Sequence, residues 1–422
     1  MNKRIGNIFK GDKVIWMVFF FLCMISIVEV FSASSGLTYK SQNYVGPIAY
    51  HTFTIVIGVV AAIVTLNVPC RYFKLLTPFL LLLSGLMLLV VLLGGGESTN
   101  DASRWIRLGP ITIQPSEIAK GTIVLTVAQI LAAMQRENGA DRKAFKWILW
   151  ITIPFCLLIG KENLSTAALL FGVVILMMII GLVPWRQIFK LVGPLAAIVV
   201  VFVAMILLFG KAPEQDLSKL TKSERIELQQ QRKDEPFVDK VLHRAGTWKN
   251  RILSFSKPDP APKDYDLDKD AQVAHANIAI VSSGIVGTGP GKSTERDFLS
   301  QAFSDFIFAI VIEELGIIGA VAVVFLYIIL LYRCARIASR CENNFPAFLA
   351  MGLGLLLVIQ ATFNMMVAVG LAPVTGQPLP LISKGGTSTI INCAYIGAIL
   401  SVSRSAKKRL EGEAEVSRSE RS

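Results

Sequence analysis

The sequence predicts an all-α polytopic membrane protein with ten transmembrane helices, both termini in the cytoplasm and one large extracytoplasmic loop. Of the 422 residues, 53% are hydrophobic and only 17% are charged, whereas soluble domains average about 45–50% and about 25%. The mean hydropathy of +0.57 also argues against a soluble enzyme and against a disordered chain. A bilayer core needs about 20 apolar residues per helix. Apolar segments of roughly that length occur at 14–33, 48–68, 75–94, 117–134, 147–160, 166–183, 188–209, 306–332, 346–368 and 387–403.

The first span follows a short basic stretch, as a signal peptide would. The apolar run from Val14 to Phe31 is longer than the roughly 7–15 residues of a signal-peptide core. We therefore expect an uncleaved transmembrane helix.

Basic residues fall on every second connection between the spans, which sets the orientation. The net charge is 42 − 30 = +12, and in membrane proteins such an excess gathers in cytoplasmic loops rather than indicating nucleic-acid binding. Ten spans with both ends in the cytoplasm keep this alternation throughout. We expect residues 1–404 to form the membrane domain, with the long polar loop 210–305 outside. Residues 405–422 are charged and rich in serine, which predicts a disordered cytoplasmic tail.

Cysteine and histidine usage argues against metal or disulfide chemistry. The chain has six cysteines and three histidines, and no two cysteines form a CxxC pair. A Cys/His zinc site needs closely spaced ligands, and a disulfide framework needs a small, cysteine-dense domain. We therefore expect neither.

The first polar cluster lies on the predicted outer side, before the fourth span. Arg104, Trp105 and Gln114 precede a helix in which Glu117 and Lys120, three residues apart, share one face. A helix start with an interfacial tryptophan and one structural ion pair would explain these residues. An ion pair inside the membrane is costly, however, and favours a functional cavity.

A glycine-rich segment from Gly284 to Ser293 has the appearance of a phosphate-binding loop. The P-loop spacing requires glycine where Val286 stands, so the pattern does not predict nucleotide binding. A loop whose N–H groups and Lys292 contact a phosphate stays an alternative.

Three acidic residues mark the eighth span. Asp305 stands at its predicted start, where a helix cap alone would explain it. Glu313 and Glu314 would lie about 12–13 Å deeper at about 1.5 Å per residue. Since residues turn by about 100° along a helix, the three cannot line one cavity, and we expect at least one to hold helices together.

The connection before the last span is unusually irregular. Its segment 370–388 contains three prolines and four glycines, together with Thr375, Ser383 and Lys384. Irregular backbone at membrane depth is tolerated where it lines a polar cavity. We therefore predict a re-entrant loop that contributes these side chains to a site.

Three motifs in this order resemble the SEDS family (shape, elongation, division and sporulation), the group of FtsW and RodA. The match is closer to the division-type members, and it runs from the first span to about Arg404. The motifs are Arg104-Trp105 with Gln114-Pro115-Ser116-Glu117 and Lys120, then Ser304-Asp305-Phe306-Ile307-Phe308-Ala309 with Glu313-Glu314-Leu315-Gly316, then Pro373, Thr375-Gly376, Leu379-Pro380, Ser383 and Gly385-Gly386.

The sequence departs from the family pattern twice. Lys161-Glu162-Asn163 stands where many members have Gln-Pro-Asp, so no role of that aspartate passes to Asn163. Lys384 stands where many members have an aromatic residue. This lysine could bind pyrophosphate or only face solvent.

The resemblance implies a peptidoglycan glycosyltransferase that polymerises lipid II into glycan strands at the outer face of the cytoplasmic membrane. It also implies a class B penicillin-binding transpeptidase and other divisome proteins as partners. Asp305 matches the family's essential aspartate and is our candidate base for the acceptor hydroxyl. Arg104, Lys120, Lys292 and Lys384 are candidates to neutralise pyrophosphate.

Other assignments follow from the same resemblance. We expect Trp105, Gln114, Glu117, Thr375 and Ser383 to shape the cavity and orient substrate. A divalent cation could share the charge on pyrophosphate, although the sequence shows no dedicated metal cage.

The alternative functions are a lipid II flippase that uses Glu117, Glu313 and Glu314 for proton coupling, an elongation-type polymerase, and a non-catalytic scaffold for a transpeptidase.

Overall fold

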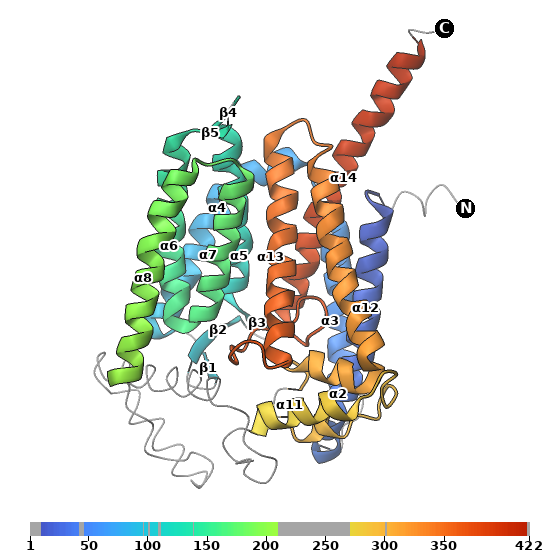
Figure 1. Cartoon of the computed structure of the whole chain (residues 1–422). Helices are drawn as coiled ribbons and strands as arrows, with labels where there is room; N and C mark the ends of the chain where they lie inside the picture. The colour runs from blue at the N-terminus through green and yellow to red at the C-terminus, as the bar shows by residue number, and fades with distance from the viewer. Residues whose placement is uncertain are drawn as a thin grey trace.

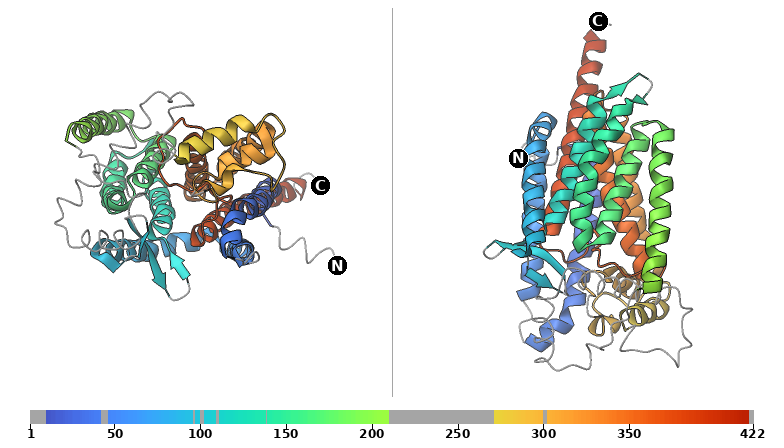
Figure 2. Two further views of the ribbon diagram at one scale, coloured as in Figure 1. Left: turned by 90° about the horizontal axis from the view of Figure 1, so that it is seen from below. Right: turned by 90° about the vertical axis from the view of Figure 1, so that its left-hand side faces the viewer.

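The structure is a computed structural model, which describes residues 10–41, 46–95, 97–99, 102–108, 111–137, 139–209, 271–299 and 302–419. It is a helical bundle in which most helices run roughly parallel (Figures 1 and 2). Most of the predicted loop 210–305 lies outside the described residues.

Nine of the ten predicted spans fall on one α-helix each, and the span 75–94 runs from α4 into the short π-helix η1 (Val91–Gly95). These helices are α2 (Lys13–Ser41), α3 (Gly46–Asn67), α4 (Cys70–Val90), α5 (Pro115–Ala133), α6 (Arg142–Glu162), α7 (Leu164–Ile180), α8 (Trp185–Phe209), α12 (Ile307–Ala338), α13 (Asn344–Ala368) and α14 (Thr387–Ser419). Where the sequence predicts disorder after residue 404, α14 continues as a helix to Ser419.

Seven helices are long and apolar enough to cross a membrane, counted over the described residues: α2, α3, α4, α5, α6, α12 and α13. The apolar helix α7 is shorter, with 17 residues. The prediction of a helical, multi-pass membrane protein is confirmed. The count of ten spans and their orientation stay predictions.

The all-α prediction missed two small antiparallel sheets. One has the strand order β1 (Glu97–Thr99), β2 (Ala102–Leu108) and β3 (Ile111–Ile113), and the other pairs β4 (Gln135–Arg136) with β5 (Gly139–Ala140). Strands this short give almost no periodic signal beside apolar helices. The first sheet matters for function because β2 carries Arg104 and Trp105.

The two ends of the bundle carry different connections. The sheet β1–β3, the short helix α11 (Ala271–Ser282) and the 370–386 loop lie at one end, which we call the cavity end (Figure 1). The pair β4–β5 and the far end of α14 lie at the opposite end. The described parts of the connections that the sequence predicts to be outside therefore gather at one end.

Helices α3 and α14 pack backbone against backbone. A Cβ added to Gly397 would lie 2.4 Å from the carbonyl oxygen of Ala62, and one added to Gly58 would lie 2.7 Å from Cys393 Sγ. Small residues allow such close approach between membrane helices. The contact fixes the start of α14 beside α3 at the cavity end.

Helix α12 is broken at Gly316, whose φ of 70° and ψ of −171° are not helical. The glycine-rich loop fills the break with backbone hydrogen bonds. The N–H groups of Thr288 and Gly289 donate to the carbonyls of Glu313 and Glu314, both at 2.9 Å. The N–H groups on the far side, Ile317 and Ile318, donate to the carbonyls of Gly284 and Ile285. The loop thus completes the helix that Gly316 interrupts.

The side chains of Glu313 and Glu314 also bind this loop. Glu313 accepts from the N–H of Thr294 at 2.8 Å, and Glu314 accepts from the N–H of Gly291 at 2.9 Å. Glu314 additionally accepts from the Ser32 hydroxyl of α2, so it does hold two helices together. Both carboxylates thus bind the glycine-rich loop, and the expected depth of about 12–13 Å below Asp305 stays a prediction, since the break at Gly316 lies beyond both residues.

Candidate active site

A cavity of about 290 Å³ opens at the cavity end of the bundle. Four of the predicted site residues line it: Trp105, Gln114, Glu117 and Lys384. They come from strand β2, the junction before α5, helix α5 and the 370–386 loop. The other lining residues are Tyr50, Thr112, Phe303, Ser304, Gly376, Gln377, Pro378, Gly385, Gly386 and Ser388.

Glu117 and Lys120 form a buried ion pair in α5. Lys120 Nζ lies 2.7 Å from Glu117 Oε1 and also donates to Gln360 Oε1 of α13 at 2.7 Å. Lys120 is fully buried and is not among the residues that line the cavity. Glu117 does line it, and its second carboxylate oxygen is buried without a hydrogen-bond partner among the described residues. The pair therefore leaves one buried carboxylate oxygen without a hydrogen-bond partner among the described residues.

Asp305 lies immediately before α12, beside the cavity wall. It is not itself a lining residue, but its neighbour Ser304 is, and the Ser304 hydroxyl donates to Asp305 Oδ1 at 3.0 Å. The N-cap position of α12 is Phe306, and no side chain caps the helix there. Helix capping therefore does not account for Asp305. Its backbone carbonyl accepts from Asn364 Nδ2 at 2.9 Å.

Ser383 has a structural place in the 370–386 loop. Its hydroxyl donates to the carbonyl of Ser304 at 2.6 Å and accepts from the N–H of Leu379 at 2.8 Å. These two bonds tie the loop to the segment before α12. Thr375 is also buried, and its hydroxyl has no partner among the described residues.

Among the residues that the structure describes, Lys384 is the one lysine that lines the cavity. Its N–H donates to the Phe303 carbonyl at 2.9 Å, and its ammonium lies 5.1 Å from the centre of the Phe303 ring. Burial lowers the pKa of the Lys384 ammonium below its ordinary value. The cavity is thus lined by a partly desolvated cation, Lys384, and by the carboxylate residue Glu117.

Lys292 and Arg104 are the two remaining candidates for contact with a phosphate. Lys292 is exposed in the glycine-rich loop and does not line the cavity. The N–H groups of Gly291, Ser293 and Thr294 are already bonded to Glu313 and Glu314. The loop therefore holds carboxylates of its own chain rather than presenting these groups to a phosphate. The side chain of Arg104 lies outside the described residues.

Sequence reasoning missed several polar residues at this site. Gln360 and Gln377 are buried and hydrogen-bonded there, and Tyr50 and Ser388 line the cavity. Gln360 carried a usable signal, because it stands one helical turn before Asn364 in an otherwise apolar helix. Tyr50 and Ser388 lie near helix starts and Gln377 lies in the 370–386 loop, and polar residues are ordinary in both places.

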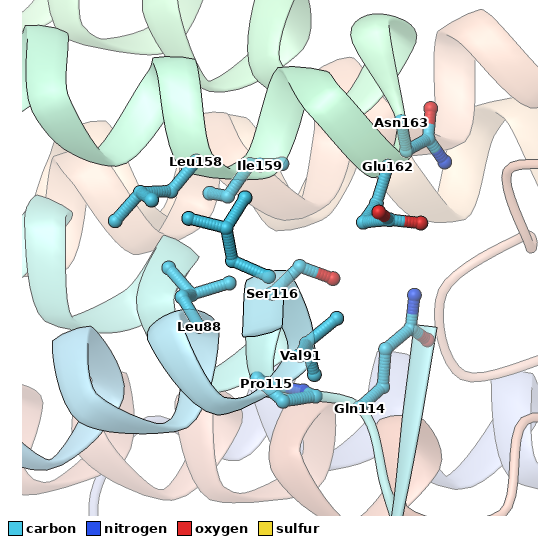
Figure 3. Close-up of a pocket in the computed structure, with 10 residues that line it drawn as sticks. Leu88, Val91, Gln114, Pro115, Ser116, Leu158, Ile159, Glu162 and Asn163 are labelled. Carbon is cyan, nitrogen blue, oxygen red and sulfur yellow. The ribbon is translucent and has the colours of Figure 1, made fainter. Parts of the chain in front are cut away.

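A second, water-sized hollow of about 20 Å³ adjoins the site (Figure 3). Leu88, Val91, Leu158 and Ile159 form its apolar wall, and Gln114 lines both this hollow and the main cavity. Figure 3 shows Gln114 and Glu162 pointing toward each other across it. Gln114 therefore separates the cavity from the gap between α4 and α6.

Metal ligands do not gather at the cavity. Within the part of the chain that the structure describes, no three His, Cys, Asp or Glu side chains are placed to hold a metal ion. A divalent cation that shared the charge on pyrophosphate would thus have few protein ligands there.

Comparison with known proteins decides the family. The family model described as "Cell cycle protein", FTSW_RODA_SPOVE, matches residues 12–408. The chain belongs to this family. A member from Geobacter metallireducens, named "Probable peptidoglycan glycosyltransferase FtsW", is 29% identical over 408 residues, covering 96% of this chain and 97% of that protein. "Peptidoglycan glycosyltransferase MrdB" of Escherichia coli K12 is 26% identical, covering 93% of each chain.

Solved structures share the family fold. A chain of "Structural coordination of polymerization and crosslinking by a peptidoglycan synthase complex" matches with a TM-score of 0.67 at 23% identity, covering 94% of this chain and 98% of that one. Thermus thermophilus rod shape determining protein RodA matches with a TM-score of 0.60 at 22% identity, with the same coverages of 94% and 98%. The bundle described above is therefore the fold of FtsW/RodA/SpoVE proteins.

Proposed function

We propose that this FtsW/RodA/SpoVE family member is a peptidoglycan glycosyltransferase that polymerises lipid II into β-1,4 glycan strands during septal cell division. The observation that carries the proposal is the convergence of Trp105, Gln114, Glu117 and Lys384 on one cavity. Ser304 also lines it and donates a hydrogen bond to the neighbouring Asp305. Relatives that match nearly the whole chain are named peptidoglycan glycosyltransferases, which supports the proposal.

The reaction requires a base for the acceptor and positive charge for the leaving group. A bond forms between the acceptor sugar's 4-oxygen and the donor's anomeric carbon, while the bond from that carbon to pyrophosphate breaks with inversion. In the proposal, Asp305 accepts the hydroxyl proton. Lys384 stabilises the departing pyrophosphate, and Glu117 and Gln114 orient the sugars. Arg104 and Lys292 are proposed as further contacts to the phosphates.

We assign the cavity to the outer face of the cytoplasmic membrane. Ten spans with both ends inside put the basic connections at the end opposite the cavity. The membrane domain then covers residues 1–404. This orientation gives the cavity access to a lipid-linked substrate in the outer leaflet.

A transpeptidase of the class B penicillin-binding type is the proposed partner, together with other divisome proteins at the septum. Similarity to a chain of a peptidoglycan synthase complex that couples polymerization with crosslinking supports a partner of this kind.

The flippase alternative gains no specific support from the three acids that were considered for proton coupling. Glu313 and Glu314 accept hydrogen bonds from the glycine-rich loop, and Glu117 is paired with Lys120. Acids engaged in this way are poorly suited to carry protons across the membrane.

The test is polymerisation of lipid II by the purified protein, with and without its transpeptidase, with glycan products resolved by gel. We expect Asp305→Ala to lower the rate by about 10²–10⁴-fold, the usual contribution of a general base. Glu137→Gln, which changes an exposed acid at the opposite end, should leave the rate unchanged. Normal polymerisation by Asp305→Ala would remove the base assignment. Lipid II transfer across proteoliposomes without any glycan product would favour the flippase.

A further inference from the structure

Helix α13 presents two buried amide side chains to the site. Gln360 and Asn364 are four residues apart, so they share one helix face. Each is only 1% exposed. An amide in such a place is costly to bury unless its donors and acceptors are used.

Gln360 connects the ion pair of α5 to the 370–386 loop. Its Oε1 accepts from Lys120 Nζ at 2.7 Å, and its Nε2 donates to the carbonyl of Pro378 at 3.1 Å. The two partners fix which end of the amide is oxygen. The position of the Lys120–Glu117 pair is thus tied to the loop through one side chain.

Asn364 makes the corresponding connection to the start of α12. Its Nδ2 donates to the carbonyl of Asp305 at 2.9 Å and to the carbonyl of Gln377 at 2.7 Å. Both hydrogens of the amide are used. The loop residues held by the two amides, Gln377 and Pro378, are adjacent, and both line the cavity.

We propose that Gln360 and Asn364 are positioning residues that set the placement of Asp305 relative to the Glu117–Lys120 pair. One rigid helix holds the backbone at Asp305 through one amide and Lys120 through the other. Both amides hold the same loop, which carries Lys384. Glycosyl transfer needs the base, the acceptor and the leaving-group cation in one geometry, and a misplacement of about 1 Å can cost about 10²-fold in rate.

This inference rests on the proposed function but makes a claim of its own about the loop. A purely structural role would predict lower stability with little effect on catalysis in the folded protein. A positioning role predicts a fall in turnover while substrate binding is largely kept, because most of the cavity wall is unchanged.

The experiment compares Asn364→Leu, Asn364→Asp and Gln360→Met with Thr362→Val in the full-length protein. Thr362 is the matched control, since it is exposed on the same turn and bonds only within its helix to Val358. Turnover of lipid II, its dissociation constant and hydrogen exchange of residues 374–386 are measured for each variant. Gln360→Glu keeps an acceptor for Lys120 and tests the loop bond alone if Gln360→Met does not fold.

We expect turnover to fall about 10- to 100-fold with a dissociation constant changed by less than about 3-fold, the pattern of an interaction that acts on the transition state. Exchange in 374–386 should quicken in the amide variants and stay unchanged in Thr362→Val. Turnover close to the parent's, or exchange unchanged in every amide variant, would overturn the proposal. If the parent itself makes no glycan strands, the proposed function fails, while the exchange result still tests whether the amides hold the loop.

Discussion

Single atoms at the cavity wall already indicate a site made for a polar ligand. Glu117 Oε2 and Ser388 Oγ are buried there without hydrogen-bond partners among the described residues. Native proteins satisfy nearly all buried polar atoms, so each exception needs an explanation. A hydrogen-bond donor placed beside Glu117 Oε2, or a partner beside Ser388 Oγ, would satisfy each atom.

Lys384 makes a prediction about pH. Burial disfavours its charged form, so its ammonium loses the proton at a lower pH than an ordinary lysine, whose pKa is 10.5. Polymerisation should therefore decline on the alkaline side as the cation is lost. Lys384→Arg keeps the charge and should extend activity to higher pH. The measurement is the polymerisation rate as a function of pH for the parent and for Lys384→Arg. A decline over the same alkaline pH range in both proteins would contradict a role for this charge.

The Glu117–Lys120 pair makes a prediction about stability. Lys120→Met leaves the Glu117 carboxylate buried without its cation, which should cost about 3–5 kcal/mol. Adding Glu117→Gln removes the unpaired charge and should restore part of the loss. Thermal unfolding in detergent compares the single and double variants. A double variant no more stable than Lys120→Met would mean that the buried charge is not the cause.

At the scale of elements, the broken helix α12 depends on the glycine-rich loop. The half-helix Ile307–Leu315 follows Asp305 and ends at the break, where loop and helix exchange backbone hydrogen bonds. Loop and half-helix should therefore order together. The loop that resembles a phosphate-binding segment is thus a structural part of helix α12.

Two glycines of this loop provide a matched test. Gly287 and Gly291 have nearly equal φ values of +81° and +80°. A Cβ on Gly287 would lie 2.3 Å from the carbonyl oxygen of Glu314, whereas one on Gly291 meets nothing within 4 Å. Gly287→Ala should therefore destabilise the fold by about 1–3 kcal/mol more than Gly291→Ala, because only the first adds a steric clash. Thermal unfolding of the two variants decides this, and equal effects would show that the loop can retract freely.

At the scale of the whole molecule, the connections sort into two ends, and the orientation is the prediction to test. Pro290 is exposed at the cavity end, and Arg340 is exposed in the connection between α12 and α13. The labelling uses cells whose cytoplasmic membrane is intact and from which any layer outside that membrane has been removed. In these cells, Pro290→Cys should react with a membrane-impermeant maleimide and Arg340→Cys should not. The parent protein, with its six native cysteines, gives the background. Labelling at Arg340→Cys alone would invert the topology.

The sequence by itself determined the helical, multi-pass membrane class and four of the residues that line the cavity, while the count of ten spans stays a prediction. Apolar runs near the length of a bilayer and polar residues within them are local signals, because lipid permits few alternatives. Glu117 could be named for this reason, whereas Trp105 and Gln114 were named from the family resemblance and Lys384 from the irregular segment before the last span. Ser383 was also named, although its bonds show that it ties the loop rather than facing the cavity.

Only the tertiary structure decided the roles of residues whose partners are distant in the chain. Glu313 and Glu314 bind a loop about twenty residues earlier, and the bond from Lys120 to Gln360 spans 240 residues. The break at Gly316 depends on Gly284–Gly289 filling it. A helical pattern in the sequence reports which residues share a face, but not which element packs against that face, since this is set by long-range packing of the whole bundle.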